Sequence, residues 1–181
     1  MYRNLPNLLT ILRLVVVPFV VYAIVSTRFQ IAALLIFSAG LTDALDGFLA
    51  RHYRWTSRTG AYLDPVADKL LLVASYVALG VQGAIPLWLM WLVLGRDCLI
   101  LAMVATAFLL TTIRDFPPSL WGKLSTIVQV FTAFAIIAAR AYNPVERWSW
   151  EPLLFLITAA ITIGSGLHYV WIANVTYARR S

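Results

Sequence analysis

Six apolar runs, each close to the length of a membrane-spanning helix, occupy most of this 181-residue sequence. A helix needs about 20 predominantly apolar residues to cross the hydrocarbon core of a bilayer. Hydrophobic residues make up 61% of the chain, compared with about 45–50% in soluble domains. We therefore predict an all-α integral membrane protein, in which residues 1–181 form one domain built as a six-transmembrane-helix bundle. The predicted spans cover residues 4–26, 30–51, 60–81, 86–110, 124–141 and 153–175.

The net charge of +6 comes from basic residues near the ends of these runs. This placement fits anionic lipid headgroups better than nucleic acid, so we expect no nucleic-acid partner. With the N-terminus inside, eight Lys and Arg residues fall on the inner side and three on the outer side. Because cytoplasmic loops carry the excess of basic residues, we expect a multi-pass protein of the bacterial inner membrane with both termini in the cytoplasm. The eight inner residues are Arg3, Arg51, Arg54, Arg58, Arg114, Lys123, Arg179 and Arg180.

Four carboxylates lie in residues 42–69, inside this otherwise apolar chain. On helices, Asp43 and Asp46 share one face, and Asp64 and Asp68 share another. Charges at membrane depth are expensive, so cations must lie among them. Oxygen ligands alone favour Mg²⁺, Mn²⁺ or Ca²⁺ over zinc, and two such ions about 4 Å apart suit displacement at phosphorus. We therefore predict a metal site on the cytoplasmic side that binds a diphosphate substrate.

Small and basic residues accompany the acids at fixed offsets. Gly47 and Ala50 share the face of the first acid pair, and Gly60 precedes the second pair on its stripe. Such small side chains would let a bulky group lie against each helix. Arg51 supplies a guanidinium fork for phosphate.

Structural roles are the alternative for these acids. Asp64 precedes Pro65, as an N-cap residue precedes proline at the first helical position. Asp43 and Asp46 could pair with Arg51 or neighbouring basic residues as buried salt bridges. An apolar chain does not need four such acids to fold, so the metal site is the favoured interpretation.

Eight residues resemble the signature of the CDP-alcohol phosphatidyltransferases in type and spacing, namely Asp43, Asp46, Gly47, Ala50, Arg51, Gly60, Asp64 and Asp68. The resemblance implies a six-helix membrane bundle, usually a homodimer, with its active site facing the cytoplasm. It also implies that the four aspartates surround two divalent cations, Mg²⁺ or Mn²⁺, with Asp68 also serving as general base. The small residues and Arg51 would contact the CDP moiety. An acceptor hydroxyl would attack the lipid-side phosphorus of CDP-diacylglycerol, and CMP would leave.

Three further segments are similar to the branch of that family that makes anionic glycerophospholipids. This branch contains the phosphatidylglycerophosphate synthases and the CMP-forming cardiolipin synthases. Arg96-Asp97 resembles the pair usual in the cardiolipin synthases and favours phosphatidylglycerol as acceptor over glycerol 3-phosphate. We favour separate partners for these two side chains, because adjacent helix positions point about 100° apart; mutual neutralisation of the pair is the alternative. The three segments are PNLLTILR, LDPVADKLL and the set Gly122, Lys123, Thr126 and Gln129.

Four polar residues are candidates for binding the acceptor. Arg114 and Lys123, on the inner side, could bind its phosphate, although a basic loop touching anionic lipid is the alternative. Asn7 and Arg13 lie on one polar face of the first predicted helix and could form a wall of the site. For Arg13 the alternative is a side chain that extends to the headgroups.

A cation or proton transporter is the alternative from another functional class, because carboxylates within membranes often line ion pathways. Such a pathway has no need for glycine, alanine and arginine at fixed offsets from the acids. An inactive scaffold is not supported, because every signature residue is present. The sequence therefore predicts a divalent-metal-dependent enzyme that joins CDP-diacylglycerol to a glycerol-containing alcohol, with other alcohols as the alternative acceptors.

Overall fold

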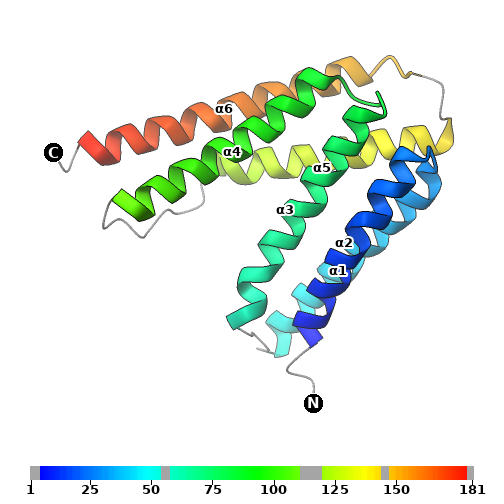
Figure 1. Ribbon diagram of the computed structural model, residues 1–181, viewed down its shortest axis with the longest axis horizontal. Helices are drawn as coiled ribbons and strands as arrows, with labels where there is room; N and C mark the ends of the chain where they lie inside the picture. The colour runs from blue at the N-terminus through cyan, green and yellow to red at the C-terminus, as the bar shows by residue number, and fades with distance from the viewer. Residues whose placement is uncertain (1–4, 54–57, 111–119, 144–146, 179–181) are drawn as a thin grey trace. The chain divides into compact units, whose positions relative to one another are not determined.

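The computed structural model describes residues 5–53, 58–110, 120–143 and 147–178, and this part of the chain contains α-helices and no strand (Figure 1). Side chains are described for these residues except 5–10, 43–53, 58–65, 104, 107–110 and 173–178. Every predicted apolar run is helical, so the all-α prediction is confirmed. The helices are α1 Leu5–Val25, α2 Phe29–Tyr53, α3 Arg58–Val81, α4 Leu87–Leu110, α5 Leu120–Tyr142 and α6 Glu151–Ala178.

Among the residues whose side chains are described, two segments are long and apolar enough to cross a membrane: α5 over Leu120–Tyr142 and the Glu151–Ile172 part of α6. α1 and α2 contain shorter apolar segments, Ile11–Val25 and Phe29–Thr42. Six spans therefore remain a prediction.

The first of two compact units contains residues 1–84 and 133–147, and in it α1 packs against both α2 and α3 (Figure 1). Residues three or four apart on a helix share a face. Val17, Val20 and Ile24 follow this spacing on α1 and are buried, as are Tyr76 and Leu79 on α3. α1 is therefore the helix in contact with both carriers of the acidic motif.

The C-terminus of α3 is closed by a Schellman motif. Gly83 has a φ of +70°, a left-handed conformation that glycine adopts without a Cβ clash. The Ala84 N–H donates to the carbonyl of Leu79 at 2.9 Å, and the Gly83 N–H donates to Gly80 at 3.1 Å. These are the two bonds expected of this motif, and they satisfy carbonyls at the helix end.

The second unit contains residues 85–132 and 148–181, and in it α4 packs against α6. Several of the side chains buried on α5 and α6 in this unit are polar. Gln129 donates to Thr162 at 3.1 Å, and the hydroxyls of Thr132 and Thr158 lie 2.7 Å apart. The uncharged polar residues buried on these two helices, among those whose side chains are described, are Ser125, Gln129, Thr132, Thr158, Thr162 and Ser165.

The outward faces of α5 and α6 are apolar. Ile127, Val130 and Phe131 on α5 are exposed, as are Leu153 and Ile163 on α6. A helix of a water-soluble protein turns its apolar stripe toward the core and its polar face outward. Polar groups satisfied between helices, with apolar side chains outside, are the arrangement expected in lipid.

Candidate active site

The eight signature residues lie on two consecutive helices. Both helices are continuous through the motif, so the acids of each pair share a face as their spacing predicts. α3 begins at Arg58, six residues before Asp64, which rules out the alternative in which Asp64 caps the helix start. α2 carries Asp43, Asp46, Gly47, Ala50 and Arg51, and α3 carries Gly60, Asp64 and Asp68.

Asp68 is the signature residue whose side chain is described, and its contact comes from α1. The Nη1 of Arg13 donates to Oδ1 of Asp68 at 2.5 Å. The side chain of Arg13 is 6% exposed, whereas that of Asp68 is 55% exposed. Arg13 is therefore held against α3, which excludes the alternative in which its side chain extends to lipid headgroups.

The remaining seven signature side chains lie outside the described set. Their convergence on one point, and the contacts of the small residues and Arg51 with CDP, stay predictions. Among the residues that were described, no three His, Cys, Asp or Glu side chains lie together.

The donor set fits divalent cations by its chemistry. All four acids of the motif are aspartates on helix faces, and their hard oxygen donors are those that Mg²⁺ and Mn²⁺ prefer. The side chain of Asp68 is more than half exposed, so its carboxylate is accessible to a ligand. Asp43, Asp46, Asp64 and Asp68 are the residues that would hold the ions.

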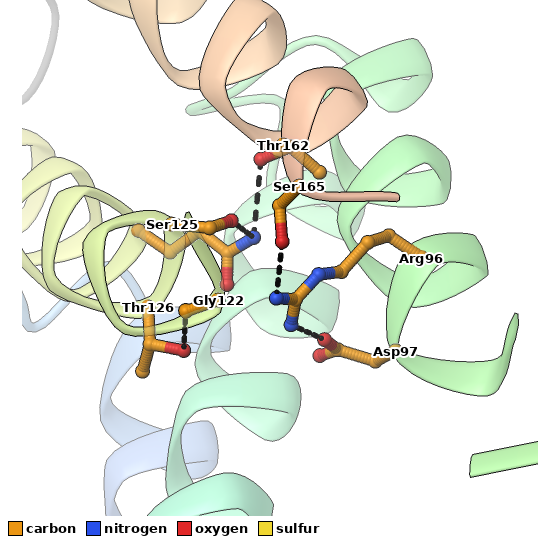
Figure 2. Close-up of polar contacts among 8 residues, drawn as sticks. Arg96, Asp97, Gly122, Ser125, Thr126, Thr162 and Ser165 are labelled. Carbon is orange, nitrogen blue, oxygen red and sulfur yellow. Dashed lines mark hydrogen bonds and ion pairs between the residues drawn. The ribbon is translucent and has the colours of Figure 1, made fainter. Parts of the chain in front are cut away.

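The acceptor candidates are placed in part. Lys123 lies in the first turn of α5 and is exposed, so it is accessible to an anionic ligand. Thr126 donates to the carbonyl of Gly122 in its own helix at 3.1 Å, as Figure 2 shows. Arg114 and the side chain of Asn7 lie outside the described residues. Their role and that of Lys123 in binding the acceptor stay predictions.

Arg96 and Asp97 pair with each other inside the second unit (Figure 2). Arg96 Nη1 donates to Oδ1 of Asp97 at 3.0 Å, and its Nη2 donates to the hydroxyl of Ser165 on α6 at 2.6 Å. The expectation of wholly separate partners was wrong, because the long arginine side chain bends back to its neighbour. Asp97 is 5% exposed, so the pair is buried. The hydrogen bond from Arg96 to Ser165 connects α4 with α6.

The polar cluster around this pair was missed from the sequence. Ser125, Gln129 and Thr132 recur at four- and three-residue steps on α5, and α6 repeats the same steps from Thr158 to Ser165. This helical period in small polar residues marks a buried face inside an apolar helix. It was the signal that could have identified the cluster.

Comparison with known proteins decides the family. The CDP-alcohol phosphatidyltransferase family matches residues 3–175, nearly the whole chain and all eight signature positions. This chain belongs to the CDP-alcohol phosphatidyltransferase family. The match extends across both compact units.

Individual members of the family resemble this chain at about one third identity. It is 36% identical to a "CDP-diacylglycerol--glycerol-3-phosphate 3-phosphatidyltransferase" of Haemophilus influenzae, with 94% of each chain covered. It is 33% identical to a "Probable cardiolipin synthase (CMP-forming)" of Drosophila melanogaster, over 96% of this chain and 59% of the relative. Against the "Cardiolipin synthase (CMP-forming)" of Homo sapiens the identity is 31%, over 93% and 62%. The chain thus spans less than two thirds of these animal relatives.

Proposed function

We propose that this protein is a phospholipid-synthesis enzyme that transfers a phosphatidyl group from CDP-diacylglycerol to a hydroxyl of a glycerol-based acceptor, releasing CMP. The acceptor is phosphatidylglycerol, giving cardiolipin, or glycerol 3-phosphate, giving phosphatidylglycerophosphate. The observation that carries the proposal is a complete signature with helical spacing on α2 and α3 in a chain that the family matches from residue 3 to residue 175.

The chain's own residues divide the work. The four aspartates would hold two divalent cations, Mg²⁺ or Mn²⁺, which supply positive charge to the phosphate oxygens when bound. Asp68 accepts the proton of the acceptor hydroxyl. At the same time the oxygen of that hydroxyl forms a bond to phosphorus, and the bond from phosphorus to CMP breaks. Proton transfer of this kind contributes about 10²- to 10⁴-fold. Positioning and charge neutralisation supply the larger part of the rate.

The names of the relatives leave two acceptors open. Arg96-Asp97 favours phosphatidylglycerol, and the buried pair links α4 to α6. We propose that the identity of residue 97 affects the acceptor through the packing of these helices. One methylene separates aspartate from glutamate, so Asp97→Glu is an informative variant to include in acceptor assays.

The proposed setting is the bacterial inner membrane, with six spans, both termini and the active site in the cytoplasm, and a homodimer as the assembly. The outward apolar faces of α5 and α6 and the eight-to-three distribution of basic residues support it. Labelling single cysteines introduced at each terminus, in a Cys98→Ser background, tests the orientation. Labelling by an impermeant reagent from outside intact cells would contradict it.

The reaction is tested by following labelled CDP-diacylglycerol with the purified full-length protein in vesicles. Phosphatidylglycerol, glycerol 3-phosphate, serine and inositol phosphate are supplied in turn, and CMP and the lipid product are identified. We expect metal-dependent CMP release with a glycerol-based acceptor, and cardiolipin as the product. Ion flux without any CMP release would instead support the transporter alternative.

The Gly47→Leu substitution is expected to abolish CDP-diacylglycerol binding while the protein stays folded. Gly47 is assigned to the nucleotide side of the motif, and a leucine side chain would fill that space. Binding of the nucleotide lipid and thermal unfolding are measured side by side. The control is Gly40→Leu on the same helix, where an added Cβ meets nothing within 4 Å. Nucleotide affinity retained by Gly47→Leu would show that the space lies elsewhere.

Removal of divalent metal by EDTA is expected to lower the thermal unfolding midpoint as well as the activity. A ligand bound by the native state alone stabilises it by about 2.7 kcal/mol at 100 times its Kd. The midpoint is compared with and without EDTA, and again after Mg²⁺ or Mn²⁺ is restored. The Asp68→Asn variant is the control, since its midpoint should respond less. A midpoint that EDTA leaves unchanged would argue against bound metal.

A further inference from the structure

Arg13 makes a contact that neither the signature nor the acceptor hypothesis predicts. It lies on the buried face of α1, four residues before Val17 and seven before Val20, so its stem packs inside the first unit. Burying a guanidinium costs several kcal/mol unless an anion and hydrogen bonds compensate it. Asp68 is an anion that contacts it.

The contact restrains the carboxylate of Asp68 more than the guanidinium of Arg13. The Nη1 of Arg13 donates directly to Oδ1 of Asp68, so the two charged groups are in contact. Asp68 is 55% exposed, and an exposed side chain samples several rotamers. The side chain of Arg13 is only 6% exposed. It therefore provides a fixed group against which the carboxylate is oriented.

The helix that carries Arg13 packs against both helices that carry the motif. α1 packs against α2, which carries the first acid pair, and against α3, which carries the second. The Arg13 guanidinium also offsets the negative charge of the Asp68 carboxylate that it contacts. Protein groups that orient metal ligands in this way commonly affect metal affinity or activity by about 10- to 100-fold.

We propose that Arg13 is a positioning residue for the proposed metal site. Its guanidinium fixes the orientation of the Asp68 carboxylate, so that this carboxylate can bind a cation together with the other aspartates. The inference rests on the proposed function. It replaces the hypothesis that Arg13 binds the acceptor, and it makes α1 a part of the catalytic apparatus.

The test measures Mn²⁺ binding to the full-length protein by calorimetry, together with kcat and the KM for the acceptor. We expect Arg13→Gln to weaken Mn²⁺ binding by about 10- to 100-fold and to lower kcat, with little change in KM. Arg13→Lys should recover part of the affinity, because it restores the charge without the fork. Arg140→Gln removes another buried arginine, from α5, and should leave Mn²⁺ affinity unchanged.

A double mutant separates positioning from general stability. Arg13→Gln added to Asp68→Asn should weaken Mn²⁺ binding no further than Asp68→Asn alone, because interacting residues are not additive. Unchanged or tighter Mn²⁺ binding by Arg13→Gln would overturn the proposal while leaving the metal site intact. So would a change confined to the KM of the acceptor. Absence of Mn²⁺ binding by the wild-type protein would overturn both the metal site and the role of Arg13.

Discussion

The Asp68→Asn variant is expected to lose at least about 100-fold in the rate of CMP release, because it removes a general base worth about 10²- to 10⁴-fold. The loss should be larger still, since the same carboxylate is assigned to the metal site. Asparagine keeps the shape and one oxygen but accepts no proton at the pH of the assay. The measurement is the initial rate of CMP release from CDP-diacylglycerol at saturating acceptor and metal.

Two controls test whether the loss of activity is specific to Asp68 and is not caused by unfolding. Glu146→Gln changes an acid that is not part of the signature, and this variant should keep the wild-type rate. The thermal unfolding of Asp68→Asn should remain cooperative, so that lost activity is not lost folding. A variant that is folded and fully active would exclude Asp68 from the chemistry. In that case the remaining three acids would have to account for the reaction.

Local pattern was enough to predict the helices and the family. The apolar runs match α1 to α6 closely, because runs of this length at helical spacing have few other ways to satisfy their backbone in lipid. The spacing from Asp43 to Asp68 predicted the family that the comparisons then identified over residues 3–175. These predictions depend on residues that are a few positions apart on one helix, and their spacing can be read directly from the sequence.

Contacts between helices were harder to predict. The partner of Arg13 lies 55 residues away along the chain, and its choice depends on how α1 rotates against α3. The pairing of Arg96 with Asp97 was considered less favoured than separate partners for a different reason. The argument from helix angle considered where each Cβ points, whereas the reach of a long arginine side chain decides which groups meet.

The Asp97→Leu variant is expected to destabilise the protein by about 3–5 kcal/mol, the cost of leaving one member of a buried ion pair without its counter-charge. The guanidinium of Arg96 would keep Ser165 and the ring of Tyr169, 5.9 Å away, and neither of these carries a negative charge. The free energy of unfolding in detergent is the measured quantity. Asp97→Asn, which removes the charge but keeps the shape, should fall between Asp97→Leu and the wild type.

The Arg96→Leu/Asp97→Leu double variant tests whether the protein needs the ion pair itself or only needs each charge to be paired with the other. Apolar replacement of a whole buried pair is often neutral or stabilising, and the hydroxyl of Ser165 can donate to a carbonyl of its own helix. We therefore expect the double variant to be more stable than Asp97→Leu, although it carries one more substitution. If the two losses simply add, the pair is not the source of the destabilisation. Packing of the α4–α6 interface would then depend on the shapes of these side chains and not on their charges.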